Sequence, residues 1–140
     1  MTNAYRELGF TDVCVRAFID SIVDEYRAAQ LVICRAGAMT AAEVSAAGRP
    51  AIFVPLPIAG GHQAENVRQL VASDAAFLLE QNAELGEKLA VMLPALIGDR
   101  VRLAAVARRA RAAAYTEGGS AGEVIARELL RLSSNQRGTQ

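Results

Sequence analysis

Residues 31–66 read LVICRAGAMTAAEVSAAGRPAIFVPLPIAGGHQAEN, and this stretch decides the fold. Two short apolar runs rich in Val and Ile, Leu31–Cys34 and Ala51–Val54, are typical of buried parallel strands. Between them lies a run of helix-forming residues, Met39–Ala47, followed by Gly48 at the position where a helix C′ glycine is expected. Parallel strands need such a crossover, so the sequence predicts a right-handed βαβ unit.

The turn that enters this helix is the predicted ligand site. Ligands of open α/β sheets bind beyond the carboxyl ends of the strands. Gly37 permits a close approach of the backbone to a ligand. The N–H groups of Ala38, Met39 and Thr40, together with the helix dipole, favour an anion such as phosphate. The carboxylate of Glu43, one turn further on, can accept hydrogen bonds from a sugar diol.

A simpler interpretation of two of these residues also fits. Thr40 and Glu43 have the spacing of a capping box, in which two side chains satisfy the donors at a helix start. On spacing alone, the capping box is favoured over a ligand site.

Length and composition set the outer bounds. The chain has 140 residues, 52% hydrophobic and 21% charged, as in a single globular domain. Fifteen basic residues balance fifteen acidic ones, so no net charge favours nucleic acid. Cys14 and Cys34 each fall inside a predicted strand, which favours buried free thiols over a disulfide. The first ten residues lack a signal-peptide pattern and no apolar run reaches about 20 residues, so a cytoplasmic protein is expected.

The N-terminal part predicts one more strand and helix. Val13–Val15 reads as a first strand, with Phe18 and Ile19 at its carboxyl end. Asp20 is the expected N-cap of a helix over Ser21–Ala29. The apolar stripe of that helix comprises Ile22, Val23 and Tyr26. From the residues alone, Phe18 is best explained as a hydrophobic staple beside the cap.

The sequence after the βαβ unit predicts a loop, then helices and a short strand. A Pro- and Gly-rich loop at 55–61 precedes a helix from His62 to Val71, whose inward residues are Val67, Leu70 and Val71. A lone His at such a junction is usually a surface residue. Ala75–Leu79 is a possible last strand.

Three more helices complete the prediction. One ends near Gly98 and carries Leu85, Leu89, Met92, Leu93, Leu96 and Ile97 on one face. The second, Asp99–Ala114, turns Leu103, Val106, Ala107 and Ala110 inward. The third begins at a Ser120–Glu123 capping box and carries Val124, Ile125, Leu129 and Leu132. Arg100, Arg102, Arg108, Arg109 and Arg111 are interpreted as a solvated face, and residues 133–140 as a frayed tail.

Four motifs in order resemble one enzyme family. They are Phe18-Ile19-Asp20, the run from Cys34 to Glu43, the run from Ala47 to Pro55, and His62-Gln63-x-x-Asn66. Together they resemble the C-terminal donor-binding portion of the MurG-type glycosyltransferases of family 28, which have the GT-B fold. These enzymes transfer N-acetylglucosamine from UDP-GlcNAc to a lipid-linked muramyl-pentapeptide, converting lipid I to lipid II in peptidoglycan synthesis.

The resemblance implies an α/β fold with a Rossmann-like, three-layer parallel sheet followed by C-terminal helices. It implies a donor-binding domain over residues 1–132, incomplete at its N-terminal side. The turn at Phe18 would hold the uracil, and His62 and Gln63 would bind sugar hydroxyls. The substrate-binding residues implied by the resemblance are Phe18, Ile19, Gly37, Ala38, Met39, Thr40, Glu43, His62, Gln63 and Asn66.

The family's mechanism is an inverting, direct attack of an acceptor hydroxyl on the anomeric carbon. Helix N-termini would stabilise the UDP leaving group, so a metal is not necessarily needed, and no cofactor is expected. The acceptor and the catalytic base belong to an N-terminal domain that this sequence lacks, as does the peripheral contact with the cytoplasmic face of the membrane. The isolated chain is therefore expected to be inactive.

Two positions depart from the family pattern. Gly60-Gly61 replaces acidic residues, which loosens the loop, and Ala36 stands where Ser is common. Two alternatives to an enzyme fragment stay open: a stand-alone sugar-nucleotide-binding subunit that works with a separate acceptor-binding chain, or a non-catalytic relic.

Overall fold

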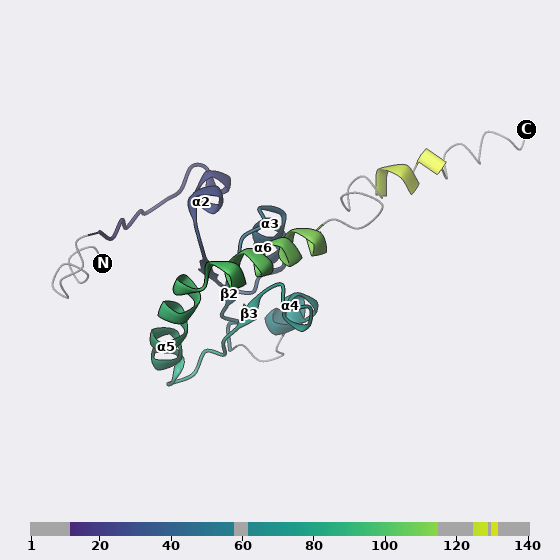
Figure 1. Ribbon diagram of the computed structural model, residues 1–140. Coiled ribbons are helices and arrows are strands. Elements are labelled where there is room, and N and C mark those ends of the chain that lie inside the picture. Colours follow the sequence, from purple (N-terminus) through teal and green to yellow (C-terminus); the bar gives the residue numbers. More distant parts are fainter. Residues whose placement is uncertain (1–11, 58–61, 115–124, 129, 132–140) are drawn as a thin grey trace, which may run out of the picture.

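The computed structural model describes residues 12–57, 62–114, 125–128 and 130–131 (Figure 1). The elements in chain order are α2 (Ile22–Ala28), β1 (Val32–Cys34), α3 (Ala38–Ala46), β2 (Ala51–Phe53), α4 (His62–Ala72), β3 (Phe77–Leu78), α5 (Leu85–Gly98) and α6 (Arg100–Ala114). Each of these elements overlaps a segment predicted from the sequence.

The strands form a parallel sheet in the order β1-β2-β3. Ile33 lies opposite Ile52, and Ile52 lies opposite Phe77. The ladder continues past the strand ends, because the N–H of Val54 donates to the carbonyl of Cys34 at 2.8 Å. The predicted βαβ unit and the α/β class are therefore confirmed.

Successive residues of each strand point to opposite faces of the sheet, and an apolar core lies on each face. Cys34, Phe53 and Leu78 belong to the core shared with α3 and α4. Ile52 and Phe77 belong to the opposite core, which α5 and the start of α6 cover. Helix α6 packs against both α3 and α5, as Figure 1 shows. The result is a helix–sheet–helix sandwich whose carboxyl edge is open for ligands.

The predicted first strand is absent. Val13–Val15 lies in a segment without helix or strand, and Cys14 is exposed. Figure 1 shows this segment leading away from the sheet, so no ladder partner holds it as a strand. The prediction of two buried thiols is therefore wrong for Cys14. Cys34, half-buried in β1, is also free, and burial raises the pKa of its thiol to about 11.

Helix α2 differs from its prediction in the same region. Its N-cap is Ser21 rather than Asp20, and no side chain caps it. Of the predicted stripe, only Tyr26 is buried, whereas Ile22 and Val23 are exposed. Because no strand lies on the outer side of β1 within the described residues, nothing covers that part of the stripe.

The C-terminal helices follow their predictions closely. Helix α5 ends at Gly98 as predicted, with Leu96 buried, but Ile97 is 51% exposed. One residue is a rotation of about 100° on a helix, which carries Ile97 off the covered stripe. On α6, Leu103 and its predicted inward neighbours are buried or half-buried.

The five arginines of α6 are exposed, as predicted, but two also fasten the helix to β3 and its approach. The guanidinium of Arg102 lies 5.3 Å from the ring centroid of Phe77. The Nε–H of Arg109 donates to the carbonyl of Asp74 at 2.9 Å. These exposed charges therefore contribute to packing.

Parts of the last prediction lie outside the described residues. These parts are the Ser120–Glu123 capping box, Val124, Leu129, Leu132 and the tail 133–140. Ile125 is described and is 60% exposed, so it does not face a core. No helix within the described ranges is long and apolar enough to cross a membrane.

Candidate functional site

The turn between β1 and α3 is the centre of the candidate site. Gly37 is the N-cap of α3, with an extended backbone, and its carbonyl accepts the N–H of Ala41 at 2.9 Å. The next N–H groups, from Ala38 to Thr40, point out of the first helical turn with no acceptor inside the helix. A Cβ built on Gly37 would contact only the Thr40 hydroxyl, at 3.8 Å. The turn therefore has the donors and the space for an anion.

The capping-box interpretation is wrong. The N-cap is Gly37, so Thr40 is the third residue of the helix, and no side chain makes a cap bond. The Glu43 carboxylate instead accepts a hydrogen bond from the Tyr26 hydroxyl at 3.3 Å. Burial, and secondarily Glu43, raise the pKa of Tyr26 above its ordinary value, so the hydroxyl keeps the proton that it donates to Glu43. The side chains of Thr40 and Glu43 therefore do not cap the helix.

Helix α4 braces the site from the next loop. The Asn66 amide donates to the carbonyl of Ala36 at 3.0 Å, which ties α4 to the β1–α3 turn. The Gln63 side-chain oxygen accepts the N–H of Leu56 at 3.0 Å, which holds the loop after β2. The remaining hydrogen-bonding atoms of both amides, Asn66 Oδ1 and Gln63 Nε2, are the ones that can face a ligand.

The other predicted site residues do not all lie near the turn between β1 and α3. His62 begins α4, but its side chain lies outside the described residues. Met39 is 74% exposed on the first turn of α3. Phe18 is 78% exposed and Ile19 is exposed beside it, on the segment that Figure 1 shows leaving the sheet. The structure therefore brings together the residues of α3 and α4 but not the turn at Phe18.

Two residues near the site carry contacts that sequence reasoning missed. Tyr26, predicted only as an apolar stripe residue, positions Glu43. Arg35 directly follows β1, donates to the carbonyl of Val54 at 3.3 Å and also bonds Gln81. Its place at the carboxyl end of a strand was the available signal.

Side chains that could bind a metal ion do not form a cluster within the described residues. Among the residues that the structure describes, no three His, Cys, Asp or Glu side chains lie close enough together to hold a metal ion. The site is built from backbone donors, two amides, one carboxylate and one guanidinium.

Comparison with known proteins gives consistent matches. The family model "Glycosyltransferase family 28 C-terminal domain" matches residues 1–120. A UDP-N-acetylglucosamine–N-acetylmuramyl-(pentapeptide) pyrophosphoryl-undecaprenol N-acetylglucosamine transferase of Geobacter sulfurreducens is 44% identical over 86% of this chain and 33% of its own length. A transferase of the same name from Vibrio cholerae is 40% identical over 95% of this chain and 36% of its own.

A solved structure shares the fold. The crystal structure of Acinetobacter baumannii MurG superposes with a TM-score of 0.68 at 37% identity, over 78% of this chain and 33% of that one. The chain thus spans about a third of the length of the relatives it matches.

Proposed function

Because the chain belongs to the C-terminal domain family of the family 28 glycosyltransferases, we propose that it binds the donor UDP-N-acetylglucosamine at the carboxyl edge of its sheet. The observation that carries this proposal is the bond from Asn66 to Ala36, which holds α4 against the turn that exposes the first N–H groups of α3. That bond supports the proposal because it joins the amides of α4 to the backbone donors of the turn; the carboxylate of Glu43 lies further along α3, against Tyr26 of α2.

Each part of the donor has a chemically matched group. The diphosphate accepts hydrogen bonds from the N–H groups of Ala38–Thr40, where the helix dipole favours negative charge. Glu43 accepts from the ribose diol, with Tyr26 holding the carboxylate in place. Gln63, and His62 beside it, bind hydroxyls of the sugar. Phe18 and Ile19 bind the uracil once their segment folds back toward α3.

We propose that the whole protein transfers N-acetylglucosamine to a lipid-linked muramyl-pentapeptide at the cytoplasmic face of the membrane. An acceptor hydroxyl attacks the anomeric carbon, the bond from that carbon to the UDP oxygen breaks, and the hydroxyl proton passes to a base. The N-terminus of α3 stabilises the negative charge of the departing UDP. The base and the acceptor site belong to the two thirds of the relatives' length that this chain does not match.

A residue-resolved NMR titration with UDP-GlcNAc tests donor binding, with UDP-glucose as the comparison. We expect selective shifts at Gly37–Thr40 and Gln63–Asn66. Glu43→Gln should weaken binding about tenfold, because a charge-assisted hydrogen bond to the ribose contributes roughly 1.5–3 kcal/mol. Glu87→Gln is the matched control, since Glu87 is an exposed residue of α5, a helix that contributes nothing to the proposed site. A well-dispersed spectrum that does not respond to UDP-GlcNAc would contradict the proposal.

A further inference from the structure

A second cavity lies between α2, α3 and α6, toward the C-terminal end of α3. Its volume is about 510 Å³. Three arginines line it, one from each side: Arg27 from α2, Arg49 from the turn after α3, and Arg111 from α6. An apolar wall is formed by Val23 and the last alanines of α3. The donor-site proposal uses none of these arginines.

Arg49 carries an unpaired donor. Its Nη1 donates to the carbonyl of Ala29 at 3.3 Å. Its Nε is buried and is the one buried side-chain nitrogen or oxygen, among the described residues, that has no hydrogen-bond partner. Buried donors are nearly always paired in folded proteins, so this guanidinium is not fully satisfied by the described residues around it.

Arg111 is held in position without being neutralised. Gly48 has a positive φ of 62°, and the side-chain carbons of Arg111 lie 3.4 Å from where a Cβ on that glycine would stand. This packing directs the stem of Arg111 across the turn. Within the described part of the chain its guanidinium has no carboxylate or hydrogen-bond partner.

The charge of the cavity is positive on balance. The carboxylate lining it is Glu43, which accepts the Tyr26 hydroxyl. Arg27 pairs with Asp24 at 3.2 Å, but both side chains of that pair are largely exposed and the pair is correspondingly weak. Among the described residues, no carboxylate pairs with Arg49 or Arg111, so both contribute positive charge to this partly open cavity.

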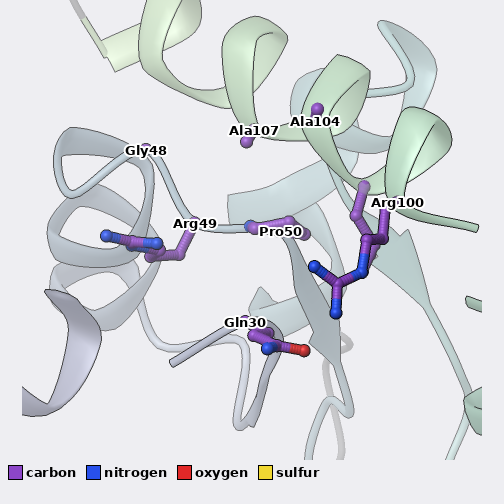
Figure 2. A pocket seen from close by; sticks show the side chains of 8 residues that line it. Gln30, Gly48, Arg49, Pro50, Arg100, Ala104 and Ala107 are labelled. Carbon is purple, nitrogen blue, oxygen red and sulfur yellow. The ribbon is translucent and has the colours of Figure 1, made fainter. Parts of the chain in front are cut away.

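We propose that Arg49 and Arg111, with Arg27 at the rim, form a binding site for a phosphate group. Guanidinium forks match the paired oxygens of phosphate, and the apolar wall suits an organic substituent on that phosphate. Arg49 also lines a smaller cavity of about 240 Å³, whose other lining residues include Arg100. Figure 2 shows Arg49 passing beneath Gly48 toward α3, while Arg100 points beneath Pro50 toward Gln30. The phosphate belongs either to a soluble metabolite or to the headgroup of an anionic lipid.

Titration of the isotope-labelled chain with inorganic pyrophosphate tests the site. We expect saturable shifts at Ala47–Arg49 and along α6 near Ala107. Arg111→Gln should weaken this binding about tenfold, because it removes a charge-assisted contact. Arg49→Gln is the second variant. Arg108→Gln is the matched control, since Arg108 is an exposed α6 residue that lines neither cavity. A dispersed spectrum establishes that each variant is folded.

Vesicle flotation separates the two sources of phosphate. Retention on phosphatidylglycerol vesicles but not on phosphatidylcholine vesicles, lost in Arg111→Gln, supports the site and assigns it to a lipid headgroup. Pyrophosphate binding without vesicle binding supports it and assigns a soluble ligand. Shifts confined to Gly37–Thr40, equal binding by Arg111→Gln, or binding to neither probe would overturn the proposal. The donor titration with UDP-GlcNAc is read at Gly37–Thr40 and Gln63–Asn66, and Glu43, which belongs to both sites, is left out of both readouts, so the two proposals can fail independently.

Discussion

Single residues with an unusual backbone conformation or an unusual hydrogen-bond partner determine how α3 packs beside this small sheet. Gly48 ends α3 in a left-handed conformation with φ of 62°, which the sequence predicted from its place after the helix. Glu43 shows the opposite case. Its partner Tyr26 lies 17 residues away on another helix, and no local pattern encodes such a pairing. Spacing within α3 suggested a capping box instead, because Thr40 and Glu43 match that motif by chance.

Gly48→Ala should destabilise the protein by about 1–2 kcal/mol, the cost of a Cβ in the left-handed region. Contact with the Arg111 side chain at 3.4 Å adds to that cost. Gly86→Ala is the control within α5, where a Cβ meets nothing within 4 Å. That substitution should be neutral or stabilising by up to about 1 kcal/mol. Chemical denaturation of both variants measures the difference, and equal stabilities would refute the role assigned to Gly48.

The two thiols should differ in reactivity and in pH dependence. Cys14 is exposed and should be alkylated first, whereas burial raises the Cys34 pKa to about 11 and suppresses its thiolate at neutral pH. Because the pKa of Cys34 in the folded state lies above the ordinary thiol value of about 9, the folded state binds this proton more tightly. The contribution of Cys34 to stability is complete below pH 9 and is lost as the pH rises toward 11. Mass spectrometry after iodoacetamide treatment checks the order, and faster labelling of Cys34 would contradict it.

At the scale of elements, periodicity was a reliable guide wherever an element has neighbours on the side it buries. Helices α3, α4, α5 and α6 and the strands between them lie where the sequence predicted. Val13–Val15 has the composition of a strand, but a strand also needs a hydrogen-bonded partner, and composition does not report one. The turn at Phe18, predicted to bind uracil, depends on the same missing pairing.

The face of α5 can be tested with two adjacent residues. Leu96 is 1% exposed within the core between α5 and the sheet, and Leu96→Ala should cost about 2–5 kcal/mol. Ile97 is 51% exposed, and Ile97→Ala should cost less than about 1 kcal/mol. Thermal or urea denaturation distinguishes the two. Similar losses would mean that α5 is rotated from the orientation described.

At the scale of the whole molecule, the described residues combine a sheet–helix core with part of a candidate site. The family resemblance, read from four short motifs, supplied the fold and the family, which the comparisons confirm. The positions of α3 and α4 followed from it. The orientation of Phe18 did not, because it depends on how the segment before α2 is held.

The isolated chain should bind UDP-GlcNAc but not transfer its sugar. Transfer needs an acceptor hydroxyl and a base, and the chain matches only about a third of its transferase relatives. Incubation with radiolabelled UDP-GlcNAc and a lipid-linked muramyl-pentapeptide, followed by extraction of the lipid, measures this directly. The full-length relative from Vibrio cholerae serves as the positive control. Label in the lipid fraction from this chain alone would refute the proposal that the acceptor site and the base lie outside this chain.

The strand order β1-β2-β3 has a consequence for how the protein is made. Each strand pairs with the one synthesised just before it, through a single intervening helix or connection. A nascent chain leaving the ribosome can therefore add one strand at a time to a sheet that is already present. Among the described strands, none has to wait for a distant strand partner, which keeps the loop-closure cost of forming the sheet small and shortens the time that apolar strands stay exposed.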